Sequence, residues 1–529
     1  MVNERVDSGV TLAELLAAFS LATDLGLGQP MEHVLRSWQI ASRLGAQVGM
    51  PDEQRPALFY VAMLAWVGCV ADAPEVAASF GDDIAFRADT YDVDVAGLQA
   101  LVFFVGHAGA GGSFGHRLRS AATLMASGGS RVARGIQSHC LTTSTLSDRL
   151  GLDADVSAAL RQFFARWDGR GFPSNVGGTD LAMPVRLFHL ADVVEVYYRN
   201  GGIDSALKVA AARRGTQFDP ALVDAFCAMA PEALSGAASS LFPGEPATVD
   251  AHALIAGEPG LRARLSESEL DRALEALADF TDLRCASRAG HSRGVAELAG
   301  AAAAKLRLSA PEVVATRRAG LVHDIGLHGV PVTILDKPGP LSATEWERVR
   351  LSSYYTERVL GRPSALARVG AIAALAHERM DGSGYHRGVS GPAIPMAGRI
   401  VAAACALRAM VEPRSHRDAL AASRAAAALR GEVRSGRLDA DATDAVLTAA
   451  GAGSRRRVAG PAGLTAREVE VLTLITHGVT TNDVARQLGI SRKTAGAHIE
   501  HIYAKTGASS RSTATLFALR NGLLNPLDL

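Results

Sequence analysis

Four residues in the second half of the chain have the types and spacing of metal ligands. His323 and Asp324 stand side by side in the string AGLVHDIG, at the end of an apolar stretch where two polar groups are costly unless they bind something. His291 precedes them in AGHSRGVAELA, and His377 follows them, just before MDGSGY. Helical bundles build metal sites from such side chains, each helix contributing one or two. The sequence therefore predicts that these four residues bind a metal.

The last stretch, residues 463–524, carries side chains suited to nucleic acid. Thr465 and Glu468 form a capping box that predicts a helix start, and Gly478 predicts its end near residue 477. A short second helix is expected at about 481–488, and a third from the cap Ser491 to about residue 506. The third helix would bury one apolar face and direct the other toward phosphates and base edges. The predicted DNA-binding residues are Ser491, Arg492, Lys493, Thr494, His498 and Lys505.

Three segments of this stretch, GLTAREVEVL, DVARQLGIS and HIEHIYAKTG, resemble the LuxR-type C-terminal domain over its whole length. The resemblance implies a four-helix helix-turn-helix domain that binds double-stranded promoter DNA. The alternative is a small solvated helical bundle. Gly496 departs from a good recognition helix, because glycine in a helix interior costs about 1 kcal/mol relative to alanine. This departure bears on base contacts more than on the fold.

Two related hexapeptides, WDGRGF at 167–172 and MDGSGY at 380–385, reveal an internal repeat. The alignment continues without a gap into RLFHLAD and RIVAAAC, so we interpret the chain as a duplication. Changes in composition place the boundaries. The expected parts are repeat one at 1–230, a linker at 231–264, repeat two at 265–452, a basic linker at 453–463 and the DNA-binding domain at 464–529.

Repeat two resembles an HD-GYP phosphohydrolase domain through HDIG, LDKPGPLSATEWERVR and HERMDGSGYHRG. The resemblance implies an all-α bundle that hydrolyses cyclic di-GMP with two or three metals, usually iron or manganese. The ligand positions of that family fall here on His291, His323, Asp324 and His377. The fold class expected for the chain is therefore all-α, with two tandem HD-GYP-like bundles followed by a LuxR-type four-helix domain.

Repeat two also departs from the pattern of the family. Leu327 stands where the family has a phosphate-binding lysine, and three further ligand positions fall on Ser352, Ala376 and Cys405. Two metals 3.5 to 4 Å apart need more than four shared ligands, so at most one divalent iron or manganese ion is expected. If the domain is active, His323 and Asp324 are the catalytic candidates; otherwise it binds metal without catalysis or keeps a vestigial polar network. Cys405 is either a thiolate ligand or a small buried side chain.

Repeat one has lost the HD pair and keeps other positions. Residues without ligand atoms stand at four of its ligand positions: Ala65, Trp66, Phe163 and Phe164. Ligand-type residues remain at His33, His139 and Asp192. These losses nearly complement those of repeat two, but each set is expected to point into its own bundle, which argues against one composite site.

Composition limits the remaining classes. The 529 residues have room for three or four domains, and 54 basic residues balance 54 acidic ones, so attraction to DNA must be local. The run Arg455 to Arg457 is either a solvated linker or a set of phosphate contacts. Five scattered cysteines without a C-x-x-C pair indicate a reducing compartment. We find no signal-peptide pattern and no membrane-length apolar run, so a cytoplasmic location without membrane association is expected.

The sequence leaves three functional hypotheses. The first is a transcription regulator in which the degenerate HD-GYP region senses a nucleotide, another small molecule or a partner and controls the helix-turn-helix. It would act as a homodimer, because one unit reads only one half-site. The second is a metal-dependent phosphodiesterase or phosphohydrolase of the cyclic dinucleotide class with a DNA-binding tail. The third is a structural platform for oligomerisation.

Overall fold

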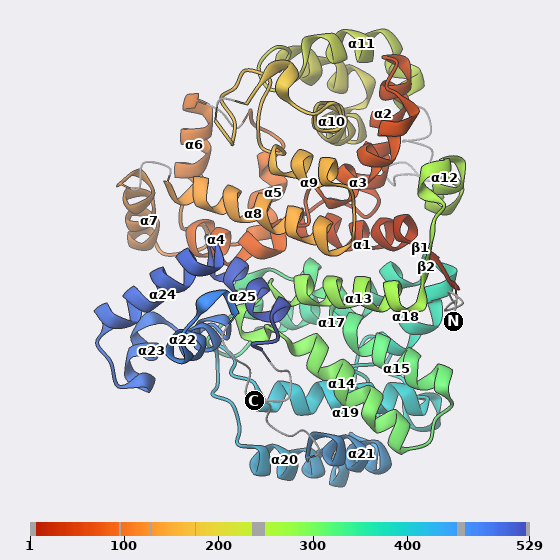
Figure 1. Cartoon of the computed structure of the whole chain (residues 1–529), viewed down its shortest axis with the longest axis vertical. Helices are drawn as coiled ribbons and strands as arrows, with labels where there is room; N and C mark the ends of the chain where they lie inside the picture. The colour runs from red at the N-terminus through yellow and green to blue at the C-terminus, as the bar shows by residue number, and fades with distance from the viewer. Residues whose placement is uncertain are drawn as a thin grey trace. The chain divides into compact units, whose positions relative to one another are not determined.

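The computed structural model describes residues 7–94, 97–126, 130–174, 176–234, 249–451 and 461–524. It divides into two compact units, Met1–Leu270 and Asp271–Leu529 (Figure 1). The run Arg455 to Arg457, within the expected basic linker, lies outside the described residues, as does part of the expected linker 231–264. The domain boundaries at 230, 264, 452 and 463 stay predictions.

The first unit is built from helices, with one short two-stranded sheet. Strands β1 (Asp7–Thr11) and β2 (Arg264–Ser266) pair antiparallel, with Asp7 opposite Ser266. Thr11 then caps the first helix and forms a capping box with Glu14. The helices are α1 (Leu12–Gly26), α2 (His33–Gln47), α3 (Arg55–Leu64), α4 (Cys69–Phe80), α5 (Asp83–Thr90), α6 (Gly97–His107), α7 (Phe114–Ala126), α8 (Ser130–Arg149), α9 (Ala154–Arg161), α10 (Met183–Ala212), α11 (Pro220–Leu234) and α12 (Ala251–Gly257).

The second unit contains a helical bundle and, after it, the C-terminal domain. Helix α14 packs against α15, α19 and α21, and these contacts bring the ends of separate helices to one place. The bundle helices are α13 (Glu267–Asp282), α14 (His291–Lys305), α15 (Ala310–Val322), α16 (Val332–Leu335), α17 (Ala343–Leu360), α18 (Ala367–Ala373), α19 (Met396–Val411), α20 (Ala422–Arg434) and α21 (Ala440–Gly451).

The two bundles share their element order, as the duplication predicts. Helices α2 and α14 both begin at the histidine that the repeat alignment pairs, His33 and His291. Helices α10 and α19 begin at Met183 and Met396, which the ungapped alignment of the hexapeptides also pairs. The tandem all-α architecture is therefore confirmed.

The C-terminal domain has the four helices α22 (Ala466–Thr476), α23 (Thr481–Leu488), α24 (Arg492–Thr506) and α25 (Arg511–Arg520). The Thr465–Glu468 capping box and the Ser491 cap both form. Gly489 and Gly507 end their helices in the left-handed conformation, with φ of 63° and 70°, where glycine carries no steric penalty. The predicted helix boundaries are confirmed to within a residue.

One stretch, Asp52–Phe80, passes a test of length and composition for crossing a membrane. Its apolar window is 78% buried inside the protein, and it includes α3 and α4 of the first bundle. Because buried core helices pass the same test, this stretch is weak evidence for a membrane-spanning segment.

Candidate metal centre and nucleic-acid interface

The four predicted ligands of repeat two meet at one point. His291 is the first residue of α14, His323 ends α15, Asp324 follows it, and His377 lies just beyond α18. The Asp324 carboxylate lies among the three rings, 3.7 Å from Nε2 of His291, 3.3 Å from Nε2 of His323 and 3.6 Å from Nε2 of His377. The structure therefore brings together the side chains that the spacing singled out.

Contacts at Nδ1 orient the two buried imidazoles, those of His291 and His323. Nδ1 of His291 lies 2.7 Å from Oε2 of Glu412, and Nδ1 of His323 donates to the carbonyl of Gly320 at 2.9 Å. With Nδ1 engaged, Nε2 of each ring faces the centre, and among the described residues neither Nε2 has a hydrogen-bond partner. A metal-binding histidine is held in the same way, its second nitrogen fixed by a carboxylate or carbonyl. Buried unsatisfied nitrogens of this kind fit a metal.

The rings also have the protonation state of ligands. Burial, together with the neighbouring charges of His377 and Arg288, lowers the pKa of His323 to about 3. Burial likewise lowers the pKa of His377 to about 3, and it holds that of His291 well below the ordinary range although Glu412 opposes the shift. Neutral imidazole binds metal, whereas imidazolium does not.

Cys405 belongs to the same cluster. A ligand atom from each of His291, His323 and Cys405 lies within 4.8 Å of the others, and all three residues are buried. Burial raises the pKa of the Cys405 thiol, so the sulfur is protonated unless a cation takes the proton's place. Of the two readings that the sequence left for this residue, the thiolate ligand gains a geometric basis.

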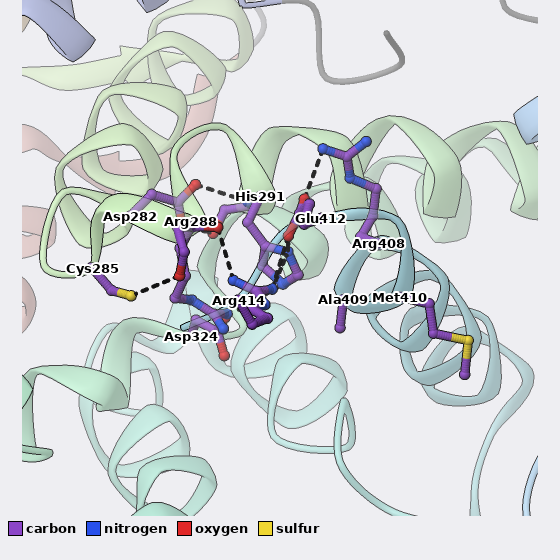
Figure 2. A network of polar contacts seen from close by, with 12 residues as sticks. Asp282, Cys285, Arg288, His291, Asp324, Arg408, Ala409, Met410, Glu412 and Arg414 are labelled. Carbon is purple, nitrogen blue, oxygen red and sulfur yellow. Dashed lines mark hydrogen bonds and ion pairs between the residues drawn. The ribbon is translucent and has the colours of Figure 1, made fainter. Parts of the chain in front are cut away.

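Arg288 enters the centre from the segment between α13 and α14, a position that no sequence motif indicated. Its guanidinium contacts Oδ2 of Asp324 (Figure 2). Glu412 joins the same network, accepting from Arg414 at 2.8 Å and lying 2.7 Å from His291. Although burial acts to raise it, the pKa of Glu412 is lowered to about 2 by His291 and two arginines. Glu412 follows Cys405 by two helical turns, a signal that sequence reasoning could have used.

Repeat one brings His33 and Asp192 together, but a tryptophan closes the space between them. The indole N–H of Trp66 donates to Oδ1 of Asp192 at 3.2 Å, the Tyr91 hydroxyl donates to Oδ2 at 3.1 Å, and Nε2 of His33 lies 3.0 Å from Oδ1. Although burial opposes it, Glu195 and Asp192 raise the pKa of His33 to about 10. Three donors on the Asp192 carboxylate leave no place for a metal between it and His33.

His139 does not join this group, although the sequence placed it with the other remaining ligands of repeat one. Its Nε2 donates to the carbonyl of Ala65 at 2.7 Å, and its Nδ1 faces Asp72 at 3.5 Å. Each repeat thus keeps its polar groups within its own bundle, and no composite site is needed to explain them.

The predicted DNA-binding residues lie at the start of α24. Ser491, Arg492, Lys493 and Thr494 are exposed, and Ser491 accepts from the Thr494 amide at 3.1 Å. Their amides and side chains stand at the positive end of a helix, where phosphate is favoured. A methyl group added at Gly496 would meet nothing within 4 Å, so the glycine leaves an open surface rather than a packing need.

Two of the predicted residues differ from this group. His498 is partly buried. Lys505 donates to Glu468 at 2.9 and 2.7 Å and to the carbonyl of Gly463 at 3.1 Å. This lysine is exposed, as the helical pattern predicted, and its ammonium joins α24 to the cap of α22. Its role in DNA binding stays a prediction.

Comparisons with known proteins identify the two domains that carry these candidate sites. Residues 275–442 match the HD domain family, and residues 462–518 match the luxR family of bacterial regulatory proteins. The chain is 29% identical over 421 residues to 3′3′-cGAMP-specific phosphodiesterase 3 of Vibrio cholerae serotype O1, covering 79% of this chain and 90% of that one. It is 34% identical over 193 residues to 3′3′-cGAMP-specific phosphodiesterase 1 of the same organism, covering 36% and 44% of the two chains.

A solved structure supports the tandem arrangement. The crystal structure of a cyclic GMP-AMP specific phosphodiesterase of V. cholerae, V-cGAP3, aligns with a TM-score of 0.58 and 26% identity. The alignment covers 84% of this chain and 98% of that one. The similarity therefore extends over more of the chain than the HD-domain match does.

Proposed function

We propose that this chain, an HD-GYP-like protein with a C-terminal LuxR-type helix-turn-helix, is a transcription regulator whose second bundle senses a ligand and controls DNA binding. The LuxR-type domain implies binding to double-stranded DNA, here a promoter. We further propose that it works in the cytoplasm as a homodimer, because two-fold dimers place two recognition helices one turn of DNA apart, about 34 to 36 Å.

The observation that carries this proposal is the segment between α13 and α14. Arg288 in this segment and His291, the first residue of α14, both reach the candidate metal centre. Between them, Ala289 is 4% exposed and belongs to the hydrophobic core of the C-terminal domain, together with Leu464 and Leu519. A change at the centre that moves Arg288 therefore acts on a residue of the DNA-binding domain core.

The ligand that we propose is anionic. Arg288, Arg379 and Arg414 lie close enough to Cys405 that each acts to lower the pKa of its thiol, against the effect of burial. Three cations around one centre favour a phosphate group, which accepts charge-assisted hydrogen bonds from guanidinium. Because the similar proteins are named for 3′3′-cGAMP, a cyclic dinucleotide is the ligand class to test first.

The experiment measures DNA affinity of the full chain by fluorescence anisotropy, on a fragment that the protein selects from a random-sequence library. We expect 3′3′-cGAMP or cyclic di-GMP to change the affinity, and Arg288→Ala to change it without ligand. Arg430→Ala, an exposed arginine on α20, is the matched control. If neither nucleotide nor Arg288→Ala shifts the affinity, the sensing role is wrong and the structural platform is favoured.

A phosphodiesterase is the second candidate, because the unpartnered Nε2 atoms of His291 and His323 fit a metal and the similar proteins are named as phosphodiesterases. His291, His323, Asp324, His377 and Cys405 would hold the ion. When bound, a divalent iron or manganese ion supplies Lewis acidity toward a phosphate oxygen. The residues of the chain would orient the phosphodiester through Arg288, Arg379 and Arg414.

Turnover separates the two candidates. The full chain, loaded with Mn²⁺ or with Fe²⁺ under anaerobic conditions, is assayed for hydrolysis of 3′3′-cGAMP and cyclic di-GMP. Hydrolysis that His323→Ala abolishes, and that the exposed-histidine control His416→Ala leaves intact, would establish the enzyme. Bound metal without hydrolysis supports the regulator.

A further inference from the structure

We propose that the first bundle contains a second metal site, made by Cys69, Asp72 and His139 and suited to Zn²⁺. The site lies outside the His33–Asp192 pair that corresponds to the centre of repeat two. It does not depend on the sensing or catalytic role of the second bundle.

The three side chains come from two helices and converge. Cys69 is the first residue of α4 and Asp72 lies one turn later, so both project from the same face, while His139 comes from α8. A ligand atom from each lies within 4.8 Å of the others. Nδ1 of His139 and Oδ2 of Asp72 are 3.5 Å apart, close to the roughly 3.4 Å edge of a tetrahedral site with bonds of 2.0 to 2.1 Å.

His139 is oriented as a ligand. Its Nε2 donates to the carbonyl of Ala65 at 2.7 Å, so Nδ1 is the atom that faces Asp72. Although burial opposes the shift, Cys69 and Asp72 raise the pKa of His139 to about 10, so a cation that binds here displaces a proton from Nδ1. The residue is fully buried, and its Nδ1 has no hydrogen-bond partner among the described residues. Gly68 leaves room for the His139 ring, because a Cβ at position 68 would stand 2.5 Å from the ring atoms. A buried nitrogen fixed in this orientation and facing a thiol and a carboxylate points to a cation between them.

Arg87 of α5 orients the carboxylate of Asp72. It contacts Oδ1 of Asp72, donates to Asp83 at 3.0 Å and donates to the carbonyl of Cys69 at 2.8 Å. Oδ2 of Asp72 is thereby left for the site. With His139 neutral, a Cys69 thiolate and the two carboxylates carry three negative charges and Arg87 one positive charge, so a divalent cation makes the bound cluster neutral. The cation replaces two protons, one on the thiol and one on His139, and leaves no buried charge uncompensated.

The donor set selects the metal. Sulfur, imidazole nitrogen and carboxylate oxygen together suit Zn²⁺, whereas Mg²⁺ and Ca²⁺ prefer oxygen alone. Trp66 and Phe164 stand edge-on to the His139 ring, at centroid distances of 6.2 and 4.8 Å, and they shield that side from water. Three protein ligands in an apolar surrounding leave one position of a tetrahedral ion for a water molecule. We expect the site to stabilise the contact between α4 and α8.

The test uses Co²⁺, which replaces Zn²⁺ and gives a thiolate charge-transfer band in the near ultraviolet. The full chain carries Cys405→Ser, so that the centre of repeat two contributes no thiolate. We expect the band in this background, its loss in Cys69→Ser, and its retention in Cys140→Ser, the buried cysteine beside His139. Zinc content, measured by mass spectrometry, should fall by about one equivalent per chain in Cys69→Ser alone.

Two results would overturn the site. One is the absence of the band from the Cys405→Ser chain, which would make the cluster a hydrogen-bonded ion pair only. The other is a band and a zinc content that survive Cys69→Ser. If Cys69→Ser does not fold, the comparison is made with His139→Gln, which keeps a polar side chain and removes the imidazole. Loss of the band in that variant supports the site, and retention refutes it.

Discussion

The indole N–H of Trp66 donates to the carboxylate of Asp192 at 3.2 Å, in the place where a metal-binding bundle keeps its ion. Asp192 corresponds to Cys405 of repeat two, where the cysteine instead lies beside two imidazoles whose Nε2 atoms have no hydrogen-bond partner among the described residues. In the first bundle an aromatic side chain thus occupies the position of a metal ligand. In the second bundle the Nε2 atoms of two histidines remain available to a metal. The two repeats have diverged into a packed core and a candidate site.

Trp66→Phe should destabilise the first bundle by about 1 to 3 kcal/mol, because it removes one donor from a buried carboxylate. The change is measured as the free energy of unfolding in urea. Trp346→Phe is the control, since Trp346 is 44% exposed and its replacement should cost less than about 0.5 kcal/mol. Equal effects of the two variants would mean that the indole N–H contributes nothing specific.

Arg288→Ala should tighten metal binding in repeat two by about tenfold or more, worth at least ~1.4 kcal/mol. The guanidinium contacts the Asp324 carboxylate that a cation would use, so the two compete. Calorimetric titration with Mn²⁺ measures the change, and Arg430→Ala should leave the affinity unaltered. Weaker Mn²⁺ binding in Arg288→Ala would show that the arginine helps to assemble the centre.

Lys493→Ala and Lys505→Ala should have opposite signatures. Lys493 is exposed at the start of α24, so its loss should weaken DNA binding and reduce the slope of log affinity against log salt by about 0.9. Lys505 pairs with Glu468, so its loss should lower thermal stability by roughly 0.5 to 1 kcal/mol and leave the salt slope unchanged. A smaller salt slope in Lys505→Ala would show that Lys505 contacts a DNA phosphate.

The stability of the first bundle should depend on Asp24. Burial raises the pKa of Asp24 to about 7, while His33, the Val34 amide and Arg36 oppose the shift. The folded state therefore binds a proton that the unfolded state has released above pH 4. This contribution is complete below about pH 4 and is lost as the pH rises to 7, on the order of 1.4 kcal/mol per pH unit.

Asp24→Asn tests this dependence. The variant cannot titrate at this position, so its urea midpoint should fall less steeply than that of the wild type between pH 4.5 and pH 7. Asp52→Asn, an exposed aspartate, should keep the wild-type dependence. Parallel curves for Asp24→Asn and the wild type would contradict the raised pKa.

Much of the structure could be predicted from local signals. The caps at Thr465 and Ser491 and the glycines after α23 and α24 fixed the helix boundaries, because capping depends on residues three or four apart. The meeting of His291, His323 and Asp324 followed from apolar helices that end in polar groups. The pairing of Lys505 with Glu468 could not be predicted, because helical periodicity shows which face a side chain takes and not which residue it contacts there.

The all-α class, the repeat and the residue types available for chemistry follow from the amino-acid sequence alone. Which of these residues face one another depends on the tertiary structure. Arg288 contacts Asp324, Glu412 orients His291, and His139 turns from Asp192 toward Cys69 and Asp72, although nothing in the local sequence requires these contacts. They depend on how helices distant in sequence pack, since packing sets the distances within which charges and hydrogen bonds act.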